Sequence, residues 1–332
     1  MSASKSVWDE YWQADRLASC LNLNTPNYSA DMRQAWRDFF AALDDGAHVL
    51  DICTGNGAIA AIAVETAREM GRSFEVHGVD GAQIDPGRFV TAAGDTLKTI
   101  NFHGRTAAET LPFADDAFDA VVSNYGIEYT ARERSLPEAA RVLKPGGRLR
   151  LVVHAIEGTV MRDTRTALAQ IAFVVDTLRI HALARRAVED VVASERDAAG
   201  AGADPALHTR ALEARNEFQS AIQKVIQQYG SAADNTVVMS IVDILIHTFQ
   251  VRAGYPLEAL VAKIDEAKHE TLANRGRLIE LSRAAVDEAG ARAIAAALEQ
   301  RGLRATTVMP LLYDSDRRLI GWQIEGQKAA RR

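Results

Sequence analysis

Residues 48–59 read HVLDICTGNGAI, and this stretch decides the fold class. An apolar run ends at Ile52, glycines follow at Gly55 and Gly57, and a helical pattern begins at Ala58. A strand, a glycine turn and a helix in this order form the first part of a βαβ unit. Glycines at such a turn let a ligand approach the backbone closely, and the helix N-terminus offers unpaired N–H groups. The stretch therefore predicts an α/β fold with a ligand site at the turn.

The alternation of short apolar runs with helical patterns continues through residues 46–154. Near-continuous apolar runs suit the strands of a parallel sheet that is covered on both faces. The expected strands are His48–Ile52, Phe74–Val79, Thr99–Phe102, Phe118–Ser123 and Arg148–Val153, with helices at Ala58–Met70 and Leu136–Leu143, and an antiparallel pair follows at Ala305–Tyr313 and Leu319–Glu325.

Residues 156–274 break this rhythm and predict an all-α insertion. Two antiparallel helices are expected to pack through an apolar seam, because apolar side chains recur at spacings of three and four. Further helices are expected over residues 235–251, 257–272 and 275–300. The seam residues are Leu168, Ile171, Val175, Leu178 and Ala182 on the first helix and Ala211, Ala214, Phe218, Ala221 and Val225 on the second.

Composition narrows the classes of function. The chain has 332 residues and a net charge of −6, whereas proteins that grip nucleic acid usually carry a basic excess. The N-terminus lacks the apolar core of a signal peptide, and the apolar run at residues 237–246 is short of the roughly 20 residues that span a bilayer. Two cysteines fit a reduced compartment. We expect a cytoplasmic protein without nucleic acid, membrane span or metal.

Two acidic residues bear on the identity of the ligand. Asp51 lies four residues before Gly55, where a carboxylate can face a ligand ammonium, and a pyrophosphate-binding loop has no use for one there. Asp80 ends the second expected strand, at a spacing that suits hydrogen bonds from ribose hydroxyls. The N-cap of a helix is the alternative role for Asp80. The glycines at residues 55–60 also fit a loose dinucleotide fingerprint, so a nicotinamide-dependent oxidoreductase stays an alternative.

Two further segments have a recognisable pattern. Residues 109–122 read ETLPFADDAFDAVV, and residues 141–149 read RVLKPGGRL. Together with the D-x-x-x-G-x-G pattern at residues 51–57, they closely resemble the class I S-adenosylmethionine-dependent methyltransferases, in particular the ubiquinone/menaquinone-biosynthesis type. The resemblance implies a Rossmann-like seven-stranded sheet, mostly parallel with an antiparallel last strand, and S-adenosylmethionine as cofactor. It covers neither the helical insertion nor the substrate.

The resemblance also implies a set of cofactor contacts. In this family an acidic residue commonly stands just before Ala-Glu and contacts the adenine amino group. Ala107 stands there in this chain, so the adenine is expected to be held by backbone groups near Ala107 and Ala108, by Thr106, or by apolar packing. The implied cofactor-binding residues are Asp51, Thr54, Gly55, Asn56, Gly57, Asp80, Gly81, Ala107, Ala108, Asn124 and Tyr125.

The catalytic candidates follow the fourth and fifth expected strands. Methyl transfer is an in-line SN2 displacement from a sulfonium, so a base is needed only for a nucleophile that carries a proton of high pKa. His154 is the first candidate, and Glu128 and Tyr129 come next. A hydrogen-bonded structural role is the alternative for each of them. Trp8, Tyr11, Trp12 and Arg16 are expected to form a lid over the cofactor or to pack in the core, and an aromatic lid would attract the sulfonium.

The expected organisation has three parts. Residues 1–45 form a helical lid, residues 46–155 and 275–328 form the cofactor-binding domain, and residues 156–274 form a cap or a dimerisation module. The expected function is methyl transfer to an oxygen or nitrogen atom of an apolar or bulky small molecule, in a possible homodimer. A non-catalytic cofactor-binding protein that dimerises is the second alternative.

Overall fold

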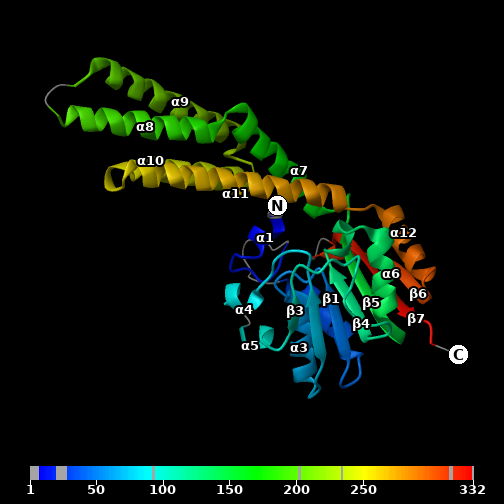
Figure 1. Cartoon of the computed structure of the whole chain (residues 1–332). Coiled ribbons are helices and arrows are strands. Elements are labelled where there is room, and N and C mark those ends of the chain that lie inside the picture. The colour runs from blue at the N-terminus through cyan, green and yellow to red at the C-terminus, as the bar shows by residue number, and fades with distance from the viewer. Residues whose placement is uncertain are drawn as a thin grey trace. The chain divides into compact units, whose positions relative to one another are not determined.

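The computed structural model divides the chain into two compact units. The first comprises Met1–Met161 with Glu280–Arg332, and the second comprises Arg162–Ile279. Figure 1 labels their helices and strands. The residues that the structure describes are 7–19, 28–91, 94–200, 203–232, 235–313 and 317–330.

The first unit is built on a seven-stranded sheet. Its strand order is β3-β2-β1-β4-β5-β7-β6, and the strands from β1 to β5 pair in parallel. Only β7 opposes its neighbours, because it pairs antiparallel with both β5 and β6. The expected mostly parallel sheet with an antiparallel last strand is confirmed. The strands are β1 (His48–Ile52), β2 (Glu75–Val79), β3 (Asn101–His103), β4 (Phe118–Asn124), β5 (Leu143–His154), β6 (Leu303–Tyr313) and β7 (Arg318–Lys328).

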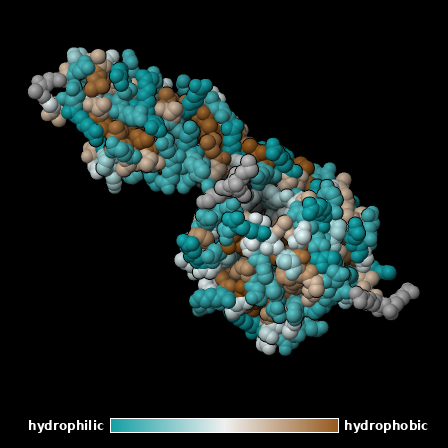
Figure 2. All heavy atoms as spheres, in the orientation of Figure 1, coloured by the Kyte–Doolittle hydropathy of each residue, from teal (hydrophilic) through white to brown (hydrophobic). Residues whose placement is uncertain are grey.

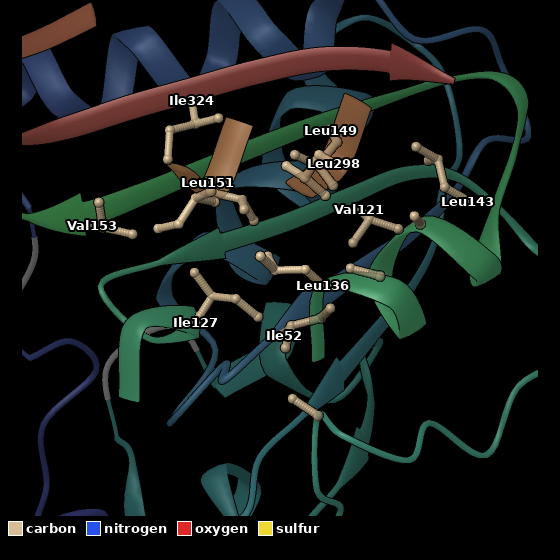
Figure 3. Packing of buried hydrophobic residues seen from close by; sticks show 14 of the residues in the cluster. Ile52, Val121, Ile127, Leu136, Leu143, Leu149, Leu151, Val153, Leu298 and Ile324 are labelled. Atoms are coloured by element: carbon tan, nitrogen blue, oxygen red, sulfur yellow. The ribbon is translucent and has the colours of Figure 1, made fainter. Parts of the chain in front are cut away.

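Helices cover both faces of the sheet. Side chains alternate along a strand, so Val121 of β4 joins one core cluster, whereas Ala120 and Val122 join the other. The first cluster also takes residues from α6 (Arg132–Val142) and α12 (Glu288–Glu299), and the second takes residues from α2 (Ala30–Ala41) and α3 (Ala58–Glu69). Figure 3 shows side chains of the first cluster, such as Leu136 of α6 and Leu151 of β5, gathered beneath the strands.

The start of β5 differs from the expectation. The pattern RVLKPGG was predicted to end a helix and turn before a strand at Arg148, but β5 begins at Leu143. Phe118 pairs with Leu143, and the register then shifts so that Ala120 pairs with Arg148. The glycines of this segment therefore belong to the irregular first part of β5, where Gly146 has a φ of +83°. Short helices that the sequence did not predict follow β2, namely α4 (Pro86–Phe89) and α5 (Gly94–Leu97).

The second unit is helical. All five seam residues predicted for α9 are buried, and all of them except Ala211 belong to the core cluster of this unit, which confirms that half of the seam. The seam predicted for the first helix is wrong at Ala182, because this residue is exposed. A π-turn and the left-handed Arg179 (φ +51°) interrupt the expected helix and shift its buried face to Ala184 and Ala187. The elements are α7 (Thr159–Ala172), η2 (Phe173–Thr177), α8 (Ile180–Ala198), α9 (Pro205–Tyr229), α10 (Thr236–Gln250), η3 (Arg252–Gly254) and α11 (Leu257–Ala284).

Helix α11 is longer than expected. The predicted end at Leu272 is wrong, because the helix continues to Ala284 through Gly276. A glycine inside a helix costs only about 1 kcal/mol, which burial of apolar residues on both sides of it offsets. The next helix, α12, begins after Asp287, whose carboxylate accepts a hydrogen bond from the N–H of Gly290 at 2.7 Å.

Hydrophobic residues do not form a continuous surface on the face shown in Figure 2, where brown groups alternate with teal hydrophilic ones. Among the described residues, no single helix is long and apolar enough to cross a membrane. The two segments Thr159–Thr177 and Ile180–Ala198, which are bent by 45° relative to each other, are together long and apolar enough to cross a membrane by length and composition alone.

A substitution that leaves a cavity in the core of the first unit should lower the stability of the protein. Ile324 of β7 has no exposed surface and packs in the cluster of Figure 3. Ile324→Ala is expected to lower the free energy of unfolding by about 2–5 kcal/mol, because the buried methyl groups leave a cavity. Urea denaturation measures the change. Gln327→Ala, at an exposed position of the same strand, is the control, and an equal loss in both variants would contradict the assignment of Ile324 to the core.

Candidate functional site

A cavity of about 290 Å³ lies at the carboxyl ends of β1, β2 and β4. Open α/β sheets bind their ligands at this edge. The N-terminal segment, residues 7–19, contributes Trp8 and Trp12 to the walls. The predicted cofactor residues that line the cavity are Asp51, Thr54, Asp80, Gly81, Ala107, Ala108, Asn124 and Tyr125. Among the predicted catalytic residues, Tyr129 lines it.

The glycine turn after β1 has left-handed backbone at alternate residues. The φ angles of Cys53, Gly55 and Gly57 are +58°, +54° and +85°. A Cβ atom at Gly57 would lie 2.5 Å from the ring of Phe102, and one at Gly55 would overlap the ring of Trp12. Both positions therefore require glycine for conformation and for space. Neither glycine lines the cavity, so their predicted cofactor contacts stay a prediction.

The two acidic residues meet at the same turn. Thr54 Oγ1 donates to Asp51 Oδ2 at 2.6 Å, and the N–H of Gly55 donates to Asp80 Oδ2 at 2.8 Å. The other oxygen of Asp80 accepts from the N–H of Ala82 at 2.8 Å. Consecutive residues, 54 and 55, thus join carboxylates from neighbouring strands, and both carboxylates face one cavity.

Burial perturbs both carboxyl groups. Desolvation raises the pKa of Asp51 to about 7, although hydrogen bonds from Thr54 and the N–H of Ala60 oppose the shift. Desolvation also raises the pKa of Asp80, against hydrogen bonds from Ala82 and Gly55. A carboxylate that is buried without a cationic partner is poised to gain from a ligand cation.

The Asn56 side chain contacts the N-terminal segment, and its predicted cofactor contact stays a prediction. Its side chain is fully buried, and Nδ2 donates to the carbonyl oxygens of Trp12 at 3.0 Å and Arg16 at 2.8 Å. Asn56 does not line the cavity. The residue therefore attaches the N-terminal segment to the glycine turn.

Three more contacts hold the N-terminal segment. Asp9 accepts from the N–H of Gln83 at 2.6 Å, and Asp15 accepts from the N–H and the hydroxyl of Thr91. Trp8 Nε1 donates to Glu280 at 2.6 Å. The expected aromatic group does come together, with Tyr11 and Trp12 in edge contact at 4.9 Å between ring centroids and Arg16 over the ring of Tyr11.

The polar lining of the cavity fits a cationic ligand. Asp51, Asp80 and Glu109 contribute carboxylates, and no described lining residue is lysine, arginine or histidine. The side-chain amide of Asn124 is buried, and neither its nitrogen nor its oxygen has a hydrogen-bond partner among the described residues. Unpaired buried amides are costly, so this one indicates a polar ligand group beside it.

Glu128 and His154 lie outside the cavity lining. His154 Nδ1 is 2.7 Å from Glu128 Oε1, which also accepts from the backbone N–H of His154. The ring of Tyr125 stacks on the imidazole with centroids 4.2 Å apart, and Tyr129 meets it edge-on at 6.2 Å. The two tyrosines line the cavity, whereas the buried Glu128–His154 pair does not.

Some lining residues were not among the predicted contacts. Cys53 lies between Asp51 and the glycines, and burial raises the pKa of its thiol well above the usual range. Its place inside the motif was the available signal. No local sequence pattern marks Tyr28 and Thr130 as lining residues, because they reach the cavity only through the tertiary fold of the chain.

Known proteins were compared with the chain. Residues 22–175 match the model of the ubiE/COQ5 methyltransferase family. The ubiquinone/menaquinone biosynthesis C-methyltransferase UbiE of Geotalea daltonii is 36% identical over 104 residues, which are 30% of this chain and 43% of the relative. The resemblance to class I S-adenosylmethionine-dependent methyltransferases is confirmed.

The methyltransferase match is confined to part of each chain. UbiE of Paracoccus denitrificans is 33% identical over 138 residues, 40% of this chain and 54% of the relative. The chain thus spans about half the length of these curated relatives. Among solved structures, the YcgJ protein from Bacillus subtilis is 16% identical, with 91% of this chain and 100% of that chain covered and a TM-score of 0.37.

The packing of Trp12 on the glycine turn can be tested directly. Gly55→Ala places a methyl group within the Trp12 ring and is expected to lower the free energy of unfolding by about 1–3 kcal/mol. Thermal and urea unfolding measure the loss. In a Trp12→Leu background the same substitution should cost less, because the clash is gone. An equal cost in both backgrounds would show that only the backbone strain matters.

Proposed function

We propose that the chain binds S-adenosylmethionine in this cavity and transfers its methyl group to a small-molecule acceptor by in-line displacement. The observation that carries the proposal is the pair of buried carboxylates, Asp51 and Asp80, which consecutive residues of one glycine turn join at one cavity. When bound, the cofactor supplies a methyl group already activated by its sulfonium.

The two carboxylates suit opposite ends of this cofactor. Asp51 would pair with the methionine ammonium, because its desolvated carboxyl gains from a cation. Asp80 would accept hydrogen bonds from the ribose hydroxyls. Its oxygens accept two backbone N–H groups, and each carboxylate oxygen can accept a further bond. Ala107 and Ala108 line the cavity at the end expected for the adenine.

The acceptor would lie beside Tyr129 and beside Asn124 and Tyr125, two residues that the sequence assigns to the cofactor and that would then contact both molecules. They follow β4, whereas Asp51 and Asp80 follow β1 and β2, so the acceptor side is the β4 side of the cavity. Asn124 would donate to or accept from a polar group of the acceptor, and the tyrosine rings would cover its apolar part. Positioning and exclusion of water can supply much of the rate, since the electrophile is already activated.

The charge of the lining restricts the acceptor class. The described lining residues provide carboxylates and no basic side chain, so a strongly anionic acceptor such as a phosphate is disfavoured beside them. A neutral or cationic acceptor with an apolar body fits. Oxygen and nitrogen are the expected nucleophiles, and the name of the UbiE relatives, C-methyltransferases, adds a carbon nucleophile as a second class.

His154 and Glu128 would support the tyrosines from the side that faces away from the cavity. The carboxylate of Glu128 holds the N–H tautomer of His154 at Nδ1, which orients the imidazole against the Tyr125 ring. The pair would therefore act by holding the Tyr125 ring in place, and Tyr129 is the catalytic candidate that lines the cavity and that an acceptor could contact directly. A dimer through residues 156–274, and a capping role for them, stay predictions.

Cofactor binding is tested by calorimetric titration with S-adenosylmethionine, S-adenosylhomocysteine and NADPH. We expect both adenosyl ligands to bind and NADPH not to bind. Asp80→Ala should lower the affinity for both adenosyl ligands on the order of tenfold to a hundredfold, since hydrogen bonds to a charged group are worth about 1.5–3 kcal/mol. Asp85→Ala, at an exposed aspartate after β2, is the matched control. Binding of NADPH alone would overturn the proposal.

Transfer is tested with carbon-13-methyl-labelled S-adenosylmethionine and a metabolite extract. A labelled product is expected, and the chemical shift of its methyl carbon distinguishes oxygen, nitrogen and carbon acceptors. Asp51→Asn should abolish the labelling. A protein that binds the cofactor and labels nothing would support the non-catalytic alternative.

The pKa of Asp51 predicts how the affinity depends on pH. Only the ionised carboxyl attracts the ligand ammonium, and its ionised fraction rises with pH through about 7. The affinity for S-adenosylhomocysteine should therefore increase roughly eightfold from pH 6.0 to 7.5, a range in which an α-amino group of pKa about 8 stays mostly protonated. Asp51→Asn should flatten the profile. A wild-type affinity that does not change with pH would refute the ammonium contact.

A further inference from the structure

Asn56 and Gly55 bind the protein's own N-terminal segment. Asn56 Nδ2 donates to the carbonyl oxygens of Trp12 and Arg16, and the ring of Trp12 fills the space that a side chain at Gly55 would take. The preceding residue, Thr54, faces Asp51 and the cavity. The turn therefore has two sides, one that meets the ligand and one that holds the segment.

The segment brings aromatic rings to the wall of the cavity. Trp8 and Trp12 line the cavity and stack on each other with centroids 6.3 Å apart, and Trp8 meets Tyr129 edge-on at 5.5 Å. Trp12 packs against Gly55, whose N–H bonds Asp80 and which directly follows Thr54, whose hydroxyl bonds Asp51. In the proposed binding mode these carboxylates hold the two ends of the cofactor, so the sulfonium lies between them.

We propose that Asn56 is a positioning residue that fixes Trp12 and Trp8 as an aromatic roof over the sulfonium, so that the site prefers the charged methyl donor over its neutral product. The proposal rests on the proposed function and adds to it the origin of this preference. A cation over the face of a tryptophan is attracted by the ring quadrupole, and a neutral thioether is not. Asn56 suits the role because its amide offers two donors to two carbonyl oxygens.

The expected result is a change in selectivity. Asn56→Ala frees the Trp12 and Arg16 carbonyls, and its ratio of affinity for S-adenosylmethionine over S-adenosylhomocysteine should fall on the order of tenfold. Trp12→Leu removes the ring itself and should reduce the ratio to the same extent. The double variant should lose no more than either single variant, because both act on one contact. Asn101→Asp, at an exposed asparagine at the start of β3, should keep the wild-type ratio.

The experiment is calorimetric titration of the full-length chain and these variants with both ligands, with circular dichroism to verify the fold. Trp12→Leu leaves the glycine turn intact, so it tests the roof even where Asn56→Ala is unstable. Loss of both ligands in equal proportion in the two variants, or an unchanged ratio, would overturn the proposal. If the wild-type chain binds neither ligand, the proposed function fails instead, which is a different result.

The position of the segment gives a second measurement. Asn56→Ala should shift the tryptophan emission to longer wavelength, since Trp12 would gain water, while Trp36 and Trp322 stay buried in the sheet core. The shift should be absent when Trp12→Leu is the background. An unchanged emission spectrum for Asn56→Ala would show that the segment stays in place without this hydrogen bond.

Discussion

The organisation of the site depends on one constraint, the left-handed backbone at the turn after β1. Positive φ angles at Cys53, Gly55 and Gly57 turn the chain sharply between the strand and helix α3. This turn directs the Thr54 hydroxyl towards Asp51 and the Gly55 N–H towards Asp80. Two carboxylates from different strands are thus held by adjacent residues, which no ordinary helical or extended backbone would allow.

The cost of burying those carboxylates is met only in part within the protein. Asp80 has backbone N–H groups at both oxygens, and Asp51 has a hydroxyl and a backbone N–H, yet burial still raises both pKa values. Among the described lining residues no basic side chain offsets the charge. The cavity is therefore built for a ligand that brings its own positive charge. The methyltransferase relationship names a cofactor class with two such charges, one at its sulfonium and one at its ammonium.

The glycine turn also connects the site to the N-terminal segment. Gly55 lacks a side chain where Trp12 packs, and Asn56 donates to the backbone of that segment. One short sequence pattern therefore satisfies two physical demands at once. The positive φ angles direct Thr54 and the Gly55 N–H to the carboxylates, and the side chain of Asn56 holds the segment that carries Trp12.

The sequence by itself determined the sheet, the acidic pair and the resemblance to the methyltransferase family. Strands, glycine turn and acidic strand ends are local patterns, because each follows from a side-chain period or from a backbone conformation that few residues adopt. The tertiary structure alone decided that the Asn56 side chain bonds the backbone of Trp12 and that the Tyr125 ring separates His154 from the cavity. It also decided that a π-turn changes which residues of the helical insertion are buried after Leu178. These outcomes depend on which distant segments meet, and no local period encodes that.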